Sequence, residues 1–234
     1  RWPGAGSKSG AGRATPAPGP ADSMEARRLA ILDAMGVQAY VPRAARSAGP
    51  DWAMLAASVR ECRLCGLCET RTQTVFGTGD LRARLMVIGE APGAEEDRQG
   101  EPFVGRAGML LNSMMRAAGF ERGEVYVANV LKCRPPNNRD PSAEETDRCL
   151  PYLRRQIELV APKVILCVGR IASQRLLATD TPVGKLRGRV HAFESVPVVV
   201  TYHPAYLLRS PGEKRKSWAD LKLAIQVLAN GNGA

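Results

Sequence analysis

The sequence has few aromatic residues, few histidines and no long apolar run. Phenylalanine, tryptophan and tyrosine make up 5% of the 234 residues, and histidine occurs twice. A membrane-spanning helix needs about 18 or more consecutive apolar residues, and no such run occurs, so we expect no membrane partner. The N-terminus also lacks the apolar core of a secretory signal. We therefore expect a cytoplasmic protein of bacterial type, in which cysteines stay reduced.

The composition divides the chain into two parts. Residues 1–23 are rich in Gly, Ala, Pro and Ser and lack apolar periodicity, so we expect a disordered low-complexity tail. Residues 24–234 are predicted to form one domain, since 44% hydrophobic residues suffice for a core. Lys and Arg total 33 against 23 Asp and Glu, a formal charge of +10. This excess favours a polyanionic partner, of which nucleic acid is the commonest.

Short apolar runs alternate with helical patterns along the domain. This alternation predicts an α/β fold, a three-layer α/β/α sandwich with a central, mainly parallel, four-stranded sheet. The predicted strands are residues 85–88, 125–130, 164–168 and 196–201. The predicted helices are residues 24–35, 51–61, 105–118, 142–160, 170–178 and 213–228.

Polar side chains lie at the ends of three predicted strands. Glu90 follows the first strand, Asn129 lies at the end of the second, and His203 follows the last. In a sheet of this kind the ligand binds at the carboxyl ends of the strands. A carboxylate, an amide and an imidazole are therefore predicted to converge on one site.

The spacing of four cysteines is typical of a metal centre. Cys62 and Cys65 form a C-x-x-C pair, whereas Cys133 and Cys149 lie far along the chain. Two close and two distant thiolates suit a four-thiolate centre that holds the front of the chain against the domain. Zn²⁺ and a [4Fe–4S] cluster both fit this spacing, and buried thiols without a metal are the alternative.

Two further cysteines have weaker claims. Cys68 is a competing third ligand, because it lies three residues after Cys65. Cys167 falls in an apolar strand and is expected to be a core thiol.

Five segments, in order, resemble the motifs of the family 4 uracil-DNA glycosylases, which contain an iron–sulfur cluster. The resemblance covers about residues 24–228, nearly the whole chain outside the tail. The segments are CRLC (62–65) with TRT (70–72) and FG (76–77), GEAPG (89–93), GEPFVG (100–105), NVLKCRPP (129–136) and HPAYLLR (203–209).

The resemblance implies an enzyme that flips uracil out of single- or double-stranded DNA and hydrolyses its N-glycosidic bond, initiating base-excision repair. It also implies a [4Fe–4S] cluster, a monomer, and association with the nucleoid through DNA. The cluster ligands that it implies are Cys62, Cys65, Cys133 and Cys149.

Three residues are predicted to contact the base. Phe103 lies in a glycine-flanked loop and is the expected stacking wall, with a core phenylalanine as the alternative. The Asn129 amide offers one acceptor and one donor, which match uracil N3–H and O4 and mismatch cytosine; the alternative is an amide that only satisfies the strand end. His203 is expected near uracil O2, where a hydrogen-bond donor stabilises the charge of the departing base, and the alternative is a residue that caps the next helix.

Two carboxylates and an alanine complete the predicted site. Glu90 is expected to stabilise positive charge on the sugar or to orient the attacking water. Glu96 either lines the C5 side of uracil and excludes the thymine methyl or is a solvated surface residue. Ala91 stands where the best-known families of this superfamily have an Asp, which leaves the general base unassigned.

The segment after His203 is predicted to contact DNA. Leu207 and Leu208 are expected on an exposed loop as an apolar wedge for the base stack, with ordinary core leucines as the alternative. Arg209 is expected to contact phosphates.

Two alternative functions fit parts of this pattern. A superfamily member that acts on another deaminated base, or a non-catalytic iron–sulfur DNA-binding protein, is compatible with Ala91. An electron-transfer or zinc-binding module explains the cysteines but leaves Phe103, Asn129 and His203 without a role.

Overall fold

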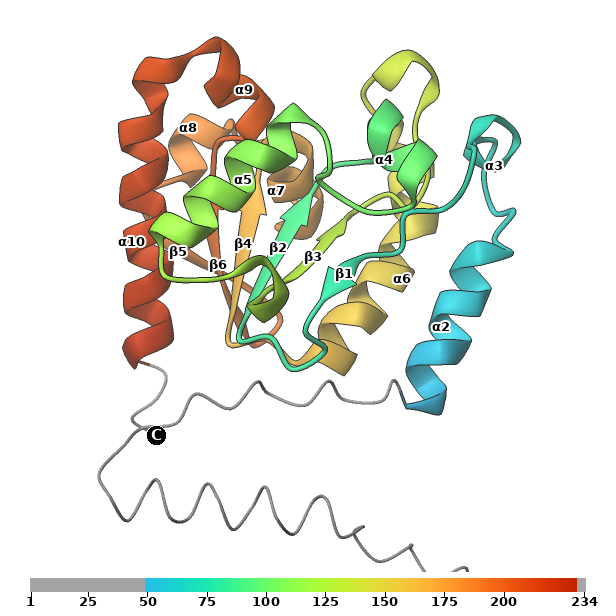
Figure 1. Cartoon of the computed structure of the whole chain (residues 1–234), viewed down its shortest axis with the longest axis horizontal. Helices are drawn as coiled ribbons and strands as arrows, with labels where there is room; N and C mark the ends of the chain where they lie inside the picture. The colour runs from blue at the N-terminus through green and yellow to red at the C-terminus, as the bar shows by residue number, and fades with distance from the viewer. Residues whose placement is uncertain (1–48, 231–234) are drawn as a thin grey trace, which may run out of the picture. The chain divides into compact units, whose positions relative to one another are not determined.

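The computed structural model describes residues 49–230. The predicted tail and the predicted helix at residues 24–35 lie outside the described residues. In the described part of the chain, six strands form one sheet in the order β1-β3-β2-β4-β6-β5 (Figure 1). The strands are β1 (Thr78–Gly79), β2 (Leu85–Gly89), β3 (Tyr126–Asn129), β4 (Val164–Val168), β5 (Val190–Phe193) and β6 (Val196–Thr201). No helix within residues 49–230 is long and apolar enough to cross a membrane.

The four predicted strands are confirmed as the parallel centre of the sheet, β3-β2-β4-β6. The strand count was too low, because the short strands β1 and β5 add antiparallel pairs at the two edges. Neither carries an apolar run that sequence periodicity can detect. β1 has two residues, and only Phe193 of β5 is buried.

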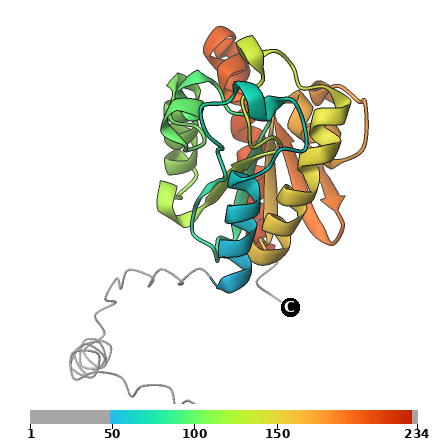
Figure 2. The ribbon, with the colours of Figure 1, turned by 90° about the vertical axis from the view of Figure 1, so that its right-hand side faces the viewer.

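Helices cover both faces of the sheet, as predicted (Figures 1 and 2). Side chains of α5 and α10 pack on one face, and side chains of α6, α7 and α8 pack on the other. The α-helices are α2 (Pro50–Arg60), α3 (Leu67–Thr70), α4 (Ala94–Gln99), α5 (Arg106–Ala117), α6 (Ala143–Val160), α7 (Arg170–Leu176), α8 (Val183–Leu186), α9 (Pro204–Arg209) and α10 (Lys214–Asn230). Three 3₁₀ turns in the described part are η1 (Arg122–Glu124), η2 (Pro136–Asn138) and η3 (Pro211–Glu213).

The central strands are buried on both faces, because each alternate side chain enters a different core. In β2, Leu85 and Val87 join the core under α5 and α10, whereas Met86 and Ile88 join the core under α6 and α7. Burying each such side chain contributes about 1.5–3 kcal/mol. Parallel strands covered on both faces therefore read as unbroken apolar runs, which is why the sequence predicts them well.

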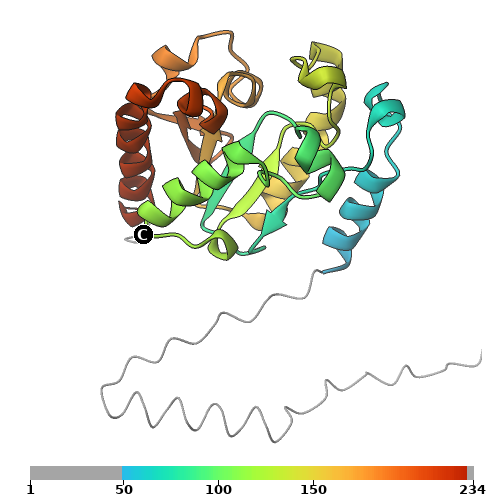
Figure 3. The ribbon, with the colours of Figure 1, turned by 45° about the horizontal axis from the view of Figure 1, so that its top comes forward.

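The carboxyl edge of the parallel strands is the upper edge in Figure 1, brought forward in Figure 3. The short helices α4 and α9 and the turn η2 lie along this edge. Loops flank all three elements. Because binding and catalytic residues are often on loops, a site is expected at this edge.

A buried carboxylate fastens α10 to the sheet. Asp220 is fully buried and accepts two hydrogen bonds from Arg187, at 3.0 Å from Nε and 2.9 Å from Nη2. It also accepts from the Gly188 backbone N–H (3.1 Å) and the Thr201 hydroxyl (2.9 Å). With four donors aimed at one carboxylate, its charge is compensated inside the protein.

Replacing Asp220 with Ala should destabilise the protein by about 3–5 kcal/mol, because Arg187 would lose its buried partner. Glu158→Ala is the matched control, since Glu158 pairs with Arg155 on the exposed surface of α6 and should cost at most about 1 kcal/mol. Urea denaturation of the two variants measures the loss of unfolding free energy in each. Equal losses would show that the Asp220 network contributes no more than a surface ion pair.

Candidate active site and thiol cavity

A cleft of about 480 Å³ opens at the carboxyl edge of the sheet, a volume typical of small-molecule pockets. The structure brings together there the predicted carboxylate, amide and imidazole. The predicted residues in its wall are Glu90, Ala91, Glu96, Phe103, Asn129, His203 and Arg209.

Asn129 is the buried floor of this cleft. It is the last residue of β3 and is 2% exposed, yet its Oδ1 has no hydrogen-bond partner. Buried polar atoms are rarely left unpaired, so this oxygen indicates a missing donor. A ligand N–H in the cleft is the natural candidate.

Gly89 makes room for the floor. It pairs with Asn129 across the parallel ladder, and a Cβ at Gly89 would lie 2.4 Å from Asn129 Oδ1 and 2.6 Å from Phe103 Cζ. Both distances are shorter than any real Cβ contact. The amide and the aromatic ring can therefore meet above β2 only because residue 89 has no side chain.

Phe103 forms a wall of the cleft in a strained backbone conformation. Its φ of 56° lies in the left-handed region, which costs a bulky residue about 1–3 kcal/mol. Gly108 of α5 contacts its carbonyl so closely that a Cβ there would lie 1.7 Å from the Phe103 oxygen. The ring stands 5.7 Å from the His203 ring, tilted by 31°.

Glu96 anchors the loop that carries Phe103. Its Oε1 accepts from the backbone N–H groups of Val104 and Gly105, both at 3.1 Å, and its Oε2 accepts from that of Gly93, also at 3.1 Å. Both oxygens therefore bind backbone on two sides of the cleft. These contacts rule out the alternative that Glu96 is a solvated surface residue. They give Glu96 a structural role, the anchoring of the Phe103 loop, that was not predicted from the sequence.

His203 is held in one tautomer. It is the N-cap of α9, and its Nδ1 accepts from the Ala205 backbone N–H at 3.1 Å. The proton of the neutral ring is thereby assigned to Nε2, which is free to donate. Burial and, to a smaller extent, the Arg209 charge lower the pKa of His203 to about 4, while the Glu96 carboxylate opposes the shift. A neutral imidazole is thus the form present near pH 7.

Glu90 has the opposite shift. Burial, with a smaller contribution from the Asp140 carboxylate, raises its pKa to about 7 against the opposing charge of Arg170. Asp140 and Arg170 form an ion pair. A carboxyl group that titrates near neutrality in a cleft is a candidate for catalysis.

The prediction of an exposed loop after His203 is wrong. Residues 204–209 form α9, which Pro204 begins at its first turn. Leu207 is fully buried and lies against α5 and α10, so it is a core leucine. Leu208 is 38% exposed and Arg209 lines the cleft, so these two reach the surface.

One wall of the cleft was not predicted. Pro135, Asn138 and Arg139 line it from the segment around η2. Arg139 is fixed there by two hydrogen bonds to Glu145, at 2.6 and 2.8 Å, and Glu145 also caps the first turn of α6. The Pro-Pro-Asn-Asn run indicates a turn in the sequence, but nothing in it shows which way the turn faces.

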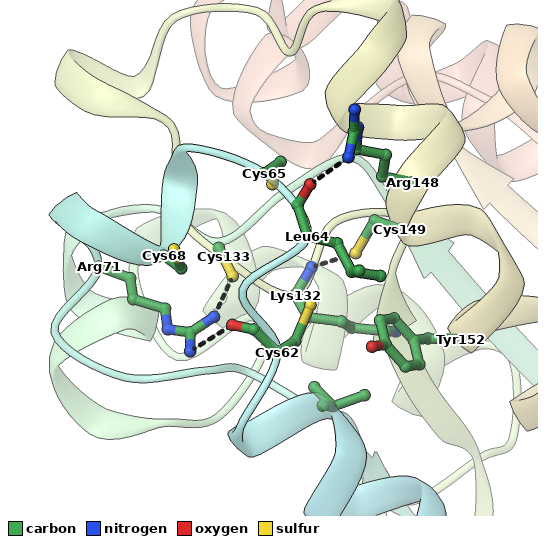
Figure 4. A pocket seen from close by; sticks show the side chains of 11 residues that line it. Cys62, Leu64, Cys65, Cys68, Arg71, Lys132, Cys133, Arg148, Cys149 and Tyr152 are labelled. Carbon is green, nitrogen blue, oxygen red and sulfur yellow. Dashed lines mark hydrogen bonds between the residues drawn. The ribbon is translucent and has the colours of Figure 1, made fainter.

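Five cysteines line a second cavity, the thiol cavity, beside the cleft (Figure 4). They come from the segment before α3, from α3 itself, from the chain after β3, and from α6. The five are Cys62, Cys65, Cys68, Cys133 and Cys149. Cys167 is fully buried in β4, where a core thiol was predicted.

Polar groups in this cavity face the sulfur atoms. Arg71 Nη1 donates to Cys133 Sγ at 3.0 Å, and the Lys132 backbone N–H donates to Cys149 Sγ at 3.3 Å (Figure 4). Burial raises the pKa of Cys149 to about 11 against the lowering effect of Lys132, and it raises the pKa of Cys133 against the lowering effect of Arg71. Donors aimed at sulfur stabilise thiolates, the form in which cysteine binds metal.

The donor set of this cavity fits a thiolate-bound group. Within residues 49–230, no three His, Cys, Asp or Glu side chains meet the geometry of a site for a single metal ion. The thiols instead surround a common space, and a polynuclear cluster is bound by cysteines arranged around it.

Lys132 separates the two cavities and was not predicted from the sequence. Its side chain is 1% exposed, and its ammonium donates to the Asn129 carbonyl (2.8 Å) and to Gln156 Oε1 (2.6 Å). Burial lowers its pKa to about 8, against the opposing effect of the thiols of Cys149 and Cys133. No sequence signal distinguishes this lysine from a surface one.

The chain is similar in sequence to proteins of a known family. The family model of the Uracil DNA glycosylase superfamily matches residues 76–222. The type-4 uracil-DNA glycosylase of Archaeoglobus fulgidus is 44% identical over 172 residues, which cover 70% of this chain and 86% of that protein. That of Thermotoga maritima is 44% identical over 154 residues, 65% of this chain and 80% of that protein. A type-5 uracil-DNA glycosylase of Pyrobaculum aerophilum is 36% identical over 169 residues, 64% of this chain and 70% of that protein. The chain therefore belongs to the uracil-DNA glycosylase superfamily, among its type-4 members.

Proposed function

We propose that the protein hydrolyses the N-glycosidic bond of deoxyuridine in DNA and so initiates base-excision repair. The observation that carries this proposal is the unpaired Oδ1 of Asn129 on the floor of the cleft. Uracil presents one N–H donor at N3, and the base must leave the duplex to reach so deep a group. The type-4 relatives are named uracil-DNA glycosylases, which supports the same reaction.

Base selection rests on the orientation of one amide. With Oδ1 accepting from uracil N3–H, the Asn129 amide nitrogen donates to O4. Cytosine has an acceptor at N3 and donors at N4, so it would leave buried groups unpaired on both sides. Phe103, held by Gly108 and by the Glu96-anchored loop, supplies the stacking wall.

Departure of the base creates two charges. When the bond between sugar C1′ and uracil N1 breaks, the electron pair leaves with uracil and spreads onto O2. The neutral His203 donates from Nε2 to that oxygen. The sugar becomes oxocarbenium-like, and the Glu90 carboxylate stabilises it until water adds at C1′ and releases its proton to solvent. Ala91 has no group to take that proton, so positioning and electrostatics carry the reaction.

DNA is bound around the mouth of the cleft. Arg209 lies in its wall and contacts phosphate, while Leu208 on the exposed side of α9 enters the base stack. Leu207 takes no part because it is buried. The protein acts as a monomer on single- or double-stranded DNA.

The thiol cavity holds a [4Fe–4S] cluster. Cys62, Cys65, Cys133 and Cys149 are the ligands, and Arg71 and the Lys132 N–H donate to sulfur. When bound, the cluster pins the segment before α3 to α6 and to the chain after β3, and it supplies no redox step. Iron and sulfide analysis of anaerobically purified protein tests this assignment, and zinc in their place would contradict it.

The deciding experiment is release of uracil from a uracil-containing oligonucleotide by purified, cluster-loaded protein. Release that leaves an alkali-labile abasic site supports the proposal. No release from either single or double strands, together with release of another deaminated base, would favour the alternative specificity that Ala91 permits.

Asn129→Ala should lower kcat/KM for uracil release about 100-fold, because it removes two buried hydrogen bonds worth roughly 1–1.5 kcal/mol each. Asn112→Ala is the matched control, since Asn112 of α5 also has an unpaired Oδ1 but lies outside the cleft. Iron content and thermal unfolding confirm that both variants are folded. Near wild-type release by Asn129→Ala would remove Asn129 as the base reader.

The rate should rise with pH through about 7, because the useful form of Glu90 is the carboxylate and burial raises its pKa to about 7. His203, with its pKa lowered to about 4, stays neutral above pH 5 and adds no falling limb. Asp140→Asn removes the charge that raises the Glu90 pKa, so the rise should move to lower pH. Glu90→Gln should abolish the rise of the rate with pH. A profile unaffected by both substitutions would assign the rise to another group.

A further inference from the structure

Lys132 is a buried cation whose hydrogen-bond acceptors are both neutral. It is 1% exposed, and its ammonium donates to the main-chain carbonyl of Asn129 and to the amide oxygen of Gln156. A buried charge normally needs an opposite charge close by. Lys132 also lines the cavity of the five cysteine sulfurs, and its backbone N–H donates to one of them, Cys149 Sγ, at 3.3 Å.

These sulfurs can supply the missing charge only as thiolates. Each cysteine that binds a metal centre does so deprotonated, so a loaded cluster places negative charge beside Lys132. Arg71, which donates to Cys133, is the cation on another side of the cavity. A four-thiolate cluster in this pocket is thus flanked by two cations, one partly exposed and one fully buried.

The same ammonium holds the floor of the uracil cleft. Asn129, three residues earlier, presents its side chain to the cleft and its carbonyl to Lys132 at 2.8 Å. Gln156 completes the contact, because its amide nitrogen donates to the Phe76 carbonyl (2.9 Å) and the Tyr126 hydroxyl (3.1 Å). The sheet, through Asn129, and α6, through Gln156, therefore both hold the ammonium in place.

We propose that Lys132 is a positioning residue that joins the two sites: it neutralises the cluster thiolates and fixes the main chain of Asn129 for uracil. The proposal rests on the cluster proposed above. Through Lys132, the iron–sulfur cluster affects the binding of uracil. A cluster that only held chain segments together would have no such effect. Groups of this kind, in contact with the ligands of a centre, typically change affinity or activity about 10–100-fold when replaced.

Lys132→Met, in the full chain purified anaerobically, keeps the length of the side chain and removes its charge and donors. Decay of the visible iron–sulfur absorption under a chelator should be about tenfold faster than in wild type. Inhibition by free uracil of the fraction that is still loaded should weaken about tenfold. Lys163→Met is the matched control, because Lys163 is exposed before β4, and both measurements should match wild type.

Unchanged decay in Lys132→Met would overturn the charge role, and unchanged uracil inhibition of loaded protein would overturn the positioning role. A protein that merely lost its cluster faster would keep normal uracil affinity while loaded, so the second measurement separates the two. Wild-type protein without iron would overturn the cluster assignment and this inference with it, whereas uracil release would still stand.

A second pair of variants covers the case in which Lys132→Met fails to fold. Gln156→Glu places a carboxylate against the ammonium and competes with the thiolates for its charge. Gln156→Met removes the same amide donors without adding charge. The cluster of Gln156→Glu should decay faster than that of Gln156→Met, and equal decay would overturn the proposal.

Discussion

Gly89 lies opposite Asn129 in the parallel ladder, and the space that its missing Cβ leaves is filled by the Asn129 amide and the Phe103 ring. The cleft depends on this close approach. Phe103 can lean over β2 only in a left-handed backbone conformation, which Gly108 and the Glu96 carboxylate hold in place. Strain in the loop is thus offset by contacts from α4 and α5, and the result is a rigid slot for a planar base.

The end of β3 serves two sites at once. Asn129 faces the cleft, Cys133 faces the thiol cavity, and Lys132 between them contacts the Asn129 carbonyl while its own N–H points at Cys149. Four consecutive peptide units thus separate the proposed base reader from a proposed cluster ligand. This continuity is the physical basis for the proposal that the thiol cavity and the cleft are coupled.

The pKa values in the cleft diverge because their environments differ. Burial and the Asp140 charge raise the pKa of Glu90, whereas burial and the Arg209 charge lower the pKa of His203. Near pH 7 the imidazole is therefore a neutral donor, and the carboxyl group is poised between its two forms. A glycosylase needs this pairing, since the leaving base takes negative charge and the sugar takes positive charge in the same step.

The sequence by itself determined the four parallel strands and the long helices, because buried strands and amphipathic helices leave strong periodic patterns. It also predicted that Glu90, Asn129 and His203 meet at the carboxyl edge of the sheet, where all three line the cleft. It also determined the candidate thiols. Tertiary structure alone decided the edge strands β1 and β5, the burial of Leu207, the anchoring role of Glu96 and the place of Lys132. Each of these depends on partners distant in the chain, and local periodicity carries no information about which segments will meet.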